Sequence, residues 1–238
     1  MGLIIVGVGG PSSSGKTTIC NSLRTILPQC TLIHLDDFYL PDGEIPMDAD
    51  LQLENWDCPE AIDWPKFQNY IDEIRATGGD VLPVESKESE SLLKLSKEEI
   101  DEAQTLIERK YPELLNSHVV LIDGFMLYHD VAISNLFDVK LYFRAPYQML
   151  KARREARAGY ATSDGFWVDP PGYFDQIVWP QYVLTHKYLF LNDDVEGELK
   201  EESKKSGLKD IFNDNTKSIK QLVLLSLDSI NDALSHTI

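Results

Sequence analysis

The stretch LIIVGVGGPSSSGKTTICNSLRTIL, residues 3–27, decides the fold of this chain. It opens with an apolar run that predicts a short buried strand, and its second half carries apolar residues at helical spacing. These are Ile19, Leu23, Ile26 and Leu27. Between the two elements, four residues satisfy the pattern G-x-x-x-x-G-K-[ST]: Gly10, Gly15, Lys16 and Thr17. The order of strand, loop and helix therefore predicts a phosphate-binding loop.

Such a loop binds phosphate because successive backbone N–H groups and the N-terminus of the helix point at one anion. We expect Lys16 to reach the β- and γ-phosphates of a nucleotide, and the Thr17 hydroxyl to hold Mg²⁺. The predicted nucleotide-binding residues of this segment are Gly10, Pro11, Ser12, Ser13, Ser14, Gly15, Lys16, Thr17 and Thr18. The alternative is a flexible Ser/Gly turn that happens to contain a lysine, and the flanking strand and helix argue against it.

The composition indicates small-molecule chemistry. The chain has 238 residues, 43% of them hydrophobic, which is enough for one sizeable core. Its formal charge is −17, so we expect no nucleic-acid partner, because such a partner needs a basic surface. The three cysteines form no C-x-x-C pair, which disfavours a disulfide framework and a zinc site. The apolar run LIIV is too short to cross a membrane, so we expect the protein in the cytoplasm or nucleus. We also expect it to be a monomer or weak dimer.

An acidic residue of the kind that a phosphate-binding loop needs follows another apolar run. In HVVLIDGFMLY, residues 118–128, four consecutive apolar residues predict a central parallel strand, and Asp123 stands at its end. Its carboxylate would join Thr17 in organising the metal, directly or through water. By itself an Asp before Gly is more often a turn or cap residue, and the loop upstream is what favours the metal role.

Three arginines follow a third predicted strand. VKLYFRA, residues 139–145, is followed by a predicted helix that starts near Pro146. Arg153, Arg154 and Arg157 fall late in this helix, with spacings that put them on one face. In a chain this acidic they indicate an anion to be bound. The alternative is a solvated helix end that complements the helix dipole.

The alternation of strands and helices predicts an α/β fold, a parallel sheet flanked by helices, as a single domain over residues 1–238. TLIHLDD, residues 31–37, becomes a second strand, whose carboxyl end places Asp36 and Asp37 at the same edge as the loop. Residues 79–117 look like a peripheral helical insertion with a capped helix from Ser96. Residues 197–220 look like a polar loop before a final amphipathic helix over 221–234.

Aromatic and acidic residues are concentrated in two segments after these strands. Most single aromatic residues of this kind pack into cores or anchor loops. Their concentration beside acids instead suits a flat, positively charged ring, and the carboxylates suit the diol of a ribose. The residues concerned are Asp36, Asp37, Phe38, Tyr39, Trp56 and Asp57, and then Tyr160, Phe166, Trp167, Asp169, Tyr173 and Phe174.

Six segments together resemble the nicotinamide riboside kinases of the fungal type, relatives of the uridine kinases. They are GPSSSGKTT (10–18), HLDDFYLPDGEIPMD (34–48), NWDCPEAID (55–63), LIDGFMLY (121–128), RREARAGY (153–160) and WVDPPGYFD (167–175). The resemblance covers roughly residues 3–192 and implies a nucleoside-kinase-like fold with a lid over residues 153–175. It also implies transfer of the γ-phosphoryl group of ATP, with Mg²⁺, to the 5′-hydroxyl of nicotinamide riboside or nicotinic acid riboside for NAD synthesis.

The resemblance also implies residue roles. Asp36 would orient or accept the proton of the 5′-hydroxyl and approach the metal, beside Lys16 as the other catalytic residue, while Asp37 would be mainly structural. Arg153 and Arg157 would contact ATP. The substrate side would comprise Asp36, Asp37, Phe38, Tyr39, Trp56, Asp57, Arg154, Tyr160, Ala161 and Asp169, and the metal ligands would be Thr17, Asp36 and Asp123. The chain departs from many relatives in carrying Asp123 in place of a glutamate, and its lid looks longer than in animal members.

Two alternatives stay open at this point. The first is a kinase for uridine, another nucleoside or a small alcohol. The second is a nucleotide-binding switch protein, against which the chain has no N-K-x-D guanine-reading motif, and its aromatic and acidic segments would have no role there. The preference between ATP and GTP does not follow from these motifs.

Overall fold

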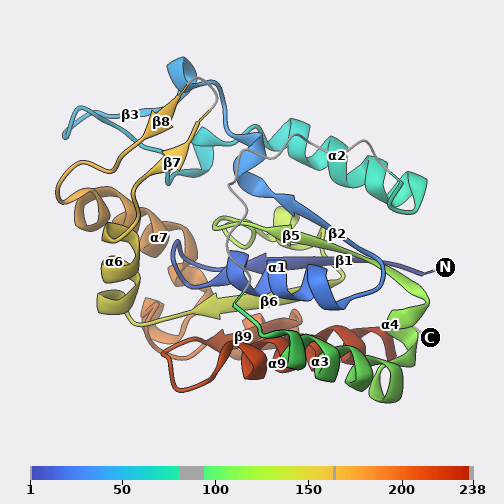
Figure 1. Ribbon diagram of the computed structural model, residues 1–238. Helices are drawn as coiled ribbons and strands as arrows, with labels where there is room; N and C mark the ends of the chain where they lie inside the picture. The colour runs from blue at the N-terminus through green and yellow to red at the C-terminus, as the bar shows by residue number, and fades with distance from the viewer. Residues whose placement is uncertain (1, 81–93, 163–164, 236–238) are drawn as a thin grey trace.

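The protein is an α/β fold built on one parallel sheet, as the sequence predicts. The computed structural model describes residues 2–80, 94–162 and 165–235. In this part of the chain the main sheet has the order β2-β5-β1-β6-β9, and each neighbouring pair is parallel. The strands are β1 (Gly2–Gly9), β2 (Cys30–His34), β5 (Ser117–Asp123), β6 (Val139–Arg144) and β9 (Leu208–Phe212). All of them end at the same edge, where ligands bind in open α/β sheets (Figure 1).

Helices cover both faces of this sheet (Figure 1). On one face lie α1 (Lys16–Ile26), α3 (Lys97–Lys110), α4 (Pro112–Leu115) and α9 (Ile219–Ser235), and on the other α2 (Trp64–Thr77) and α7 (Trp179–His186). Side chains alternate along a strand, so β1 contributes to both cores. Ile4, Val6 and Val8 belong to the first core, and Ile5 belongs to the second.

The remaining elements of the described chain are short. Two hairpins lie beyond the carboxyl edge of the sheet: β3 (Met47–Asp48) with β4 (Leu53–Glu54), and β7 (Tyr160–Ala161) with β8 (Phe166–Trp167) (Figure 1). The short helices are α5 (Val131–Ser134), α6 (Tyr147–Glu155) and α8 (Glu201–Lys205), and a π-helical stretch (Phe174–Val178) leads into α7. Single 3₁₀ turns are Leu35–Phe38, Asp42–Glu44, Pro59–Ala61, Lys187–Leu189 and Leu191–Asp193. No helix within the described residues combines the length and apolar composition that crossing a bilayer requires.

The prediction of a polar loop over residues 197–220 is wrong. The segment contains α8 and β9, and β9 pairs with β6 at the edge of the main sheet. Arg144 at the end of β6 fixes this edge, because its guanidinium donates to both carboxylate oxygens of Asp210, at 2.8 and 2.5 Å. Only Leu208 and Ile211 of β9 are buried, so the continuous apolar run that marks an inner parallel strand is missing.

The predicted second strand is shorter than expected. It ends at His34, and the chain continues as the 3₁₀ turn Leu35–Phe38. Strand alternation therefore does not decide where Asp36 and Asp37 point. The turn keeps both carboxylates at the carboxyl edge of the sheet, as the sequence predicts.

The helix predicted from Ser96 is confirmed, with its N-terminal cap. The Ser96 hydroxyl accepts the backbone N–H of Glu99 at 3.2 Å, and the Glu99 carboxylate accepts the backbone N–H of Ser96 at 2.9 Å. The helix is less peripheral than expected, because Ala103 and Ile107 on its inner side belong to the core of the sheet face. Residues 81–93 of the predicted insertion lie outside the described residues.

The reciprocal cap at Ser96 gives a stability prediction. Ser96→Ala should lower the free energy of unfolding by about 1 kcal/mol, because it leaves an N-terminal N–H of α3 without its acceptor. Urea denaturation followed by circular dichroism measures this change. Ser229→Ala is the matched control: its hydroxyl bonds the i−4 carbonyl of Leu225 within α9, so the change should be within about 0.5 kcal/mol. Equal losses in the two variants would contradict a special role for the cap.

Candidate active site

Two glycines shape the loop between β1 and α1. Gly10 has φ +128°, and a Cβ there would lie 1.9 Å from the carbonyl oxygen of Phe143 on β6. Gly15, directly before α1, has φ +98°. Residues with a side chain rarely adopt such a positive φ, and at Gly10 there is no room for a Cβ. The glycines therefore allow the tight turn after β1, and the first N–H groups of α1, which have no partner within the helix, face the loop. The geometry is that of a phosphate-binding loop.

Lys16 is buried in this loop. Its ammonium donates to the carbonyl oxygen of Pro11 at 2.9 Å. Burial lowers the pKa of Lys16 from its usual value, and the charge of Arg157 adds to this, while Asp123 and Asp36 oppose it. The charges of Arg157, Asp123 and Asp36 therefore interact electrostatically with the Lys16 ammonium.

Thr17, Asp123 and His34 form a hydrogen-bonded group at the carboxyl ends of β2 and β5. The Thr17 hydroxyl donates to Asp123 Oδ2 at 2.5 Å, and His34 Nδ1 lies 3.3 Å from the same oxygen. Burial would raise the pKa of Asp123, but the hydrogen bond and charge of His34 and the charge of Lys16 hold it below its usual value. Asp123 is thus a carboxylate at neutral pH.

The group fits a hard divalent cation. Asp123 Oδ1 is buried and has no hydrogen-bond partner among the described residues. With the Thr17 hydroxyl it offers oxygen donors of the kind that such cations prefer. Within the described residues no cluster of three His, Cys, Asp or Glu side chains could hold a metal by itself. The arrangement therefore suits an ion that takes its remaining ligands from phosphate oxygens and water.

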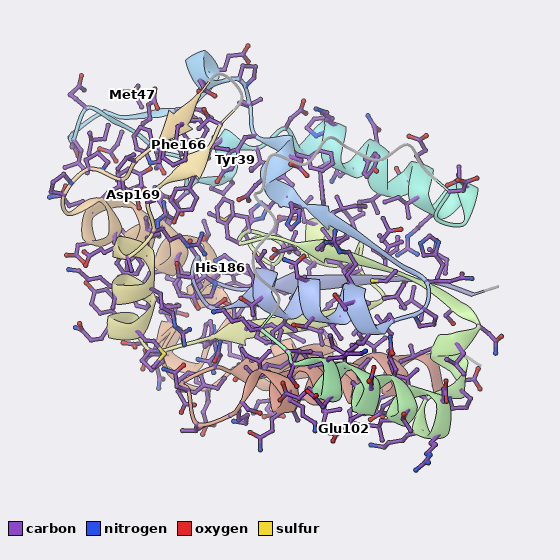
Figure 2. The ribbon with its side chains drawn as sticks, in the orientation of Figure 1. Tyr39, Met47, Glu102, Phe166, Asp169 and His186 are labelled. Atoms are coloured by element: carbon purple, nitrogen blue, oxygen red, sulfur yellow. The ribbon has the colours of Figure 1, made fainter. Side chains whose placement is uncertain are left out.

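A cleft of about 550 Å³ runs from this loop toward the two hairpins. Its loop end is lined by Ser12, Ser13, Lys16, Thr17 and Thr18, together with His34, Asp36 and Asp123. Its far end is mostly aromatic and is lined by Tyr39, Trp56, Phe125, Tyr160, Phe166 and Trp167, together with Asp57 and two arginines. Figure 2 shows Tyr39 and Phe166 on the side of the molecule where the hairpins lie.

The aromatic end is built from contacts between neighbouring rings. The rings of Tyr39 and Phe125 stack with centroids 6.1 Å apart, and Tyr39 meets Trp56 edge to face at 5.3 Å. Trp56 in turn contacts Trp167 of β8 at 5.8 Å. The Tyr39 hydroxyl donates to the carbonyl oxygen of Trp56, which fixes the two rings relative to each other. A planar ligand ring would find flat apolar walls here.

Arg154 joins the two sides of the cleft through a buried ion network. Its guanidinium donates to Asp57 at 3.0 and 3.1 Å and to Asp169 at 2.6 and 3.1 Å. Although burial alone would lower it, the two carboxylates raise the pKa of Arg154, so the guanidinium stays charged. Two carboxylates share one cation, so the three side chains carry one negative charge in excess when both acids are ionised.

The ring of Tyr160 in β7 contacts two arginines. The guanidinium carbons of Arg154 and Arg157 lie 4.8 and 5.2 Å from the centre of its ring. The Tyr160 hydroxyl is buried and has no hydrogen-bond partner among the residues that the structure describes. The cleft lining thus combines the ring of Tyr160 from β7 with two guanidinium groups from the end of α6 and the residues after it.

Most of the predicted site residues meet in this one cleft. Asp36, Tyr39, Trp56, Asp57, Asp123, Arg154, Arg157, Tyr160 and Ala161 line it together with Ser12, Ser13, Lys16, Thr17 and Thr18. Gly10, Pro11, Ser14 and Gly15 complete the phosphate-binding loop, and their side chains or Cα atoms are absent from the lining. Asp169 contacts the site through Arg154, and it lines a smaller neighbouring cavity of about 360 Å³.

Three predicted residues lie elsewhere. Phe38 packs into the core beneath α2, against Phe67, so its position does not offer the predicted substrate contact. Asp37 is buried and is not part of the cleft lining. Arg153 points away from the cleft toward the segment after β9, where its guanidinium donates to the Asn215 side chain at 2.8 Å. The shared helix face predicted for the arginines is also wrong, because α6 ends at Glu155, before Arg157.

Several cleft residues are absent from the predicted set. His34 and Phe125 lie next to predicted residues, and the register that sets His34 opposite Asp123 appears only once β2 and β5 are known to be neighbours. Thr162, Phe166 and Trp167 belong to the lid hairpin. For Phe166 and Trp167 the signal was present, since both stand in the second aromatic segment of the sequence.

Comparisons with known proteins show the family to which the chain belongs. Residues 5–158 match the model of the phosphoribulokinase / uridine kinase family. The chain is 45% identical over 201 residues to a nicotinamide riboside kinase of Eremothecium gossypii, covering 83% of this chain and 82% of that protein. It is 41% identical to the nicotinamide riboside kinase of Saccharomyces cerevisiae, covering 90% and 89%. It is 30% identical to human nicotinamide riboside kinase 2, covering 97% and 82%.

Asp123 provides a prediction that does not depend on catalysis. Asp123→Asn removes the charge that would attract the cation. The ratio of the Kd for ADP without Mg²⁺ to the Kd with Mg²⁺ should therefore be at least about tenfold smaller in this variant than in the unchanged protein. Titration of a fluorescent ADP analogue with and without Mg²⁺ measures the ratio. Asp72→Asn, at an exposed position of α2, is the control for the same change in charge. An Mg²⁺ effect that survives intact in Asp123→Asn would exclude Asp123 from the cation site.

Proposed function

The chain belongs to the phosphoribulokinase / uridine kinase family and, within it, to the nicotinamide riboside kinases, and on this basis we propose that it phosphorylates the 5′-hydroxyl of nicotinamide riboside with ATP. Nicotinic acid riboside is included as a second acceptor, and the product is a mononucleotide for NAD synthesis. The observation that carries the proposal is the single cleft that has a phosphate-binding loop at one end and an aromatic, acidic compartment at the other.

The loop end suits ATP as phosphoryl donor. Its backbone N–H groups and the N-terminus of α1 would bind the phosphates, with Lys16 at the β- and γ-phosphates. Thr17 and Asp123 would hold Mg²⁺, which neutralises charge on the phosphate oxygens when it is bound. Arg157 lines the same cleft from the lid side and supplies a further positive charge. Together these groups oppose the charge that the moving phosphoryl group carries.

The far end suits a ribose that carries a cationic ring. The walls of Tyr39, Trp56 and Trp167 would contact the flat nicotinamide ring, whose positive charge is attracted to aromatic faces. When both acids are ionised, the second carboxylate of the network around Arg154 favours the same ligand. Asp57 would accept hydrogen bonds from the ribose hydroxyls, and the hydrogen bonds from Arg154 to its carboxylate support this role by fixing its orientation.

Asp36 is the proposed acceptor for the proton of the 5′-hydroxyl. It lines the cleft, and its charge acts on the buried ammonium of Lys16. The transition state of phosphoryl transfer is loose, so orientation of the hydroxyl and neutralisation of charge contribute more than base strength. Asp36 would therefore act mainly by holding the hydroxyl in line with the γ-phosphate.

The proposal extends to the setting of the enzyme. We place the reaction in the cytoplasm or nucleus, in one kinase domain that acts as a monomer or weak dimer. The net charge of −17 supports small molecules as the partners instead of nucleic acid. Sedimentation of the purified chain over a range of concentrations tests the proposed oligomeric state.

The choice of acceptor is tested directly. Purified protein with ATP and Mg²⁺ should convert nicotinamide riboside to a product heavier by one phosphate, at a kcat/KM at least about tenfold above that for uridine, because uridine lacks the positive ring. Mass spectrometry and coupled ADP detection measure both reactions. A higher kcat/KM for uridine would make the chain a uridine kinase, and ADP binding without turnover of either riboside would favour a switch protein.

Asp36 gives a second kinetic test. Asp36→Asn keeps the size of the side chain but removes the carboxylate that would orient the 5′-hydroxyl and accept its proton, so kcat should fall by more than about a hundredfold with a smaller change in the KM for ATP. Steady-state kinetics with each substrate varied separately measures the two effects. A greater loss of kcat in Asp37→Asn than in Asp36→Asn would transfer the role to the neighbouring acid.

A further inference from the structure

The segment that follows β9 reaches back to the phosphate-binding loop. Asn213 is buried, and its side-chain amide donates to the carbonyl oxygen of Ser14 at 2.8 Å. Its backbone N–H donates to the carbonyl oxygen of Arg144 at 2.7 Å, so Asn213 is anchored to the end of β6. A rigid sheet edge thus holds one carbonyl group of the loop from a position 199 residues further along the chain.

Arg153 makes a second connection between the same two segments. Its guanidinium donates to the carbonyl oxygens of Ser13 at 3.3 Å and Asn213 at 3.4 Å, and to the side chain of Asn215. In the described chain its side chain is outside the cleft lining. The position of Arg153 therefore supports the loop from behind and differs from the direct ATP contact that the resemblance implies.

Peptide geometry gives these contacts a consequence for phosphate binding. None of the described peptide bonds is cis, and in a trans peptide the C=O and the following N–H point in opposite directions. A Ser14 carbonyl held by Asn213 therefore turns the N–H of Gly15 away from Asn213. A Cβ at Gly15 would lie only 2.6 Å from the Asn213 amide, so the two residues are in close contact. Rotation of this peptide would break the hydrogen bond to Asn213.

The conformation of the phosphate-binding loop depends on contacts from outside the loop. Ser13 has φ +65°, in the left-handed region that non-glycine residues seldom occupy. The hydroxyls of Ser13 and Ser14 are buried without hydrogen-bond partners in the described part of the protein. A backbone in this conformation persists when surrounding contacts determine it. The carbonyl groups that Asn213 and Arg153 bind belong to these same two serines.

We propose that Asn213 and Arg153 are positioning residues for nucleotide binding, which hold the carbonyl groups of Ser13 and Ser14 so that the loop is preorganised for phosphate. Asn213, although it follows β9, then belongs functionally to the nucleotide site. The inference rests on the proposed nucleotide site, and it does not depend on which acceptor is phosphorylated.

Equilibrium binding tests this inference. In Asn213→Ala, and in Asn213→Asp, whose carboxylate cannot donate to Ser14, the Kd for Mg·ADP should rise at least about tenfold, since one fixed hydrogen bond is lost behind the loop. Arg153→Gln, at a less buried position, should show a smaller rise of about threefold. The KM for the acceptor should stay within about twofold in all three variants. Calorimetric titration of the whole chain, with thermal unfolding of each variant, provides the measurements.

The controls separate positioning from general stability. Asp214→Asn changes the next residue, whose carboxylate accepts hydrogen bonds from Thr216, and it should leave the Kd for Mg·ADP unchanged. Wild-type ADP affinity in folded Asn213→Ala would overturn the inference, and so would an equal rise in the acceptor KM and the ADP Kd. If Asn213→Ala does not fold, an unchanged Kd in Arg153→Gln overturns it. An unchanged chain that binds no ADP would instead contradict the proposed function.

Discussion

The burial of β1 on both faces is the constraint on which the rest of the structure depends. Its side chains alternate between two cores, so helices must cover the sheet above and below, and every strand beside it runs parallel. Parallel strands bring their carboxyl ends to one edge, where the polar residues that follow buried strands can hydrogen-bond to one another and line a cleft. The phosphate-binding loop, Asp123 and the turn that carries Asp36 all occupy that edge.

The charges of the site are arranged against the overall charge of the chain. A protein with a formal charge of −17 would repel a nucleotide, yet Lys16, Arg154 and Arg157 meet at the cleft. Two of the acids there are held by neighbours: Thr17 and His34 contact Asp123, and Arg154 binds Asp57. Local pairing thus gives one end of the cleft affinity for an anion and the other end affinity for a cation.

The sequence predicts the inner part of the fold well, because local patterns determine it. The loop, the strand before Asp123 and the capped helix from Ser96 are each encoded in a few consecutive residues. β9 escapes prediction because an edge strand with two buried residues has no apolar run. Phe38 was predicted in the pocket because an aromatic residue beside acids gives the same local signal in a core. The partners of Arg153 and Arg154 lie in segments far apart in the chain, and local sequence patterns do not show which of these segments come together in the fold.

The shared guanidinium of Arg154 has a consequence for how small molecules enter and leave. Asp57 comes from the segment after β4, whereas Arg154 and Asp169 both belong to the predicted lid over residues 153–175, so a movement of that lid would separate the guanidinium from Asp57. The Arg154 guanidinium is buried, so without a carboxylate partner its charge is stable only if water takes the place of that partner. A lid that opens in this way would therefore admit water to Arg154, and hydration of this buried guanidinium would accompany each exchange of ligand.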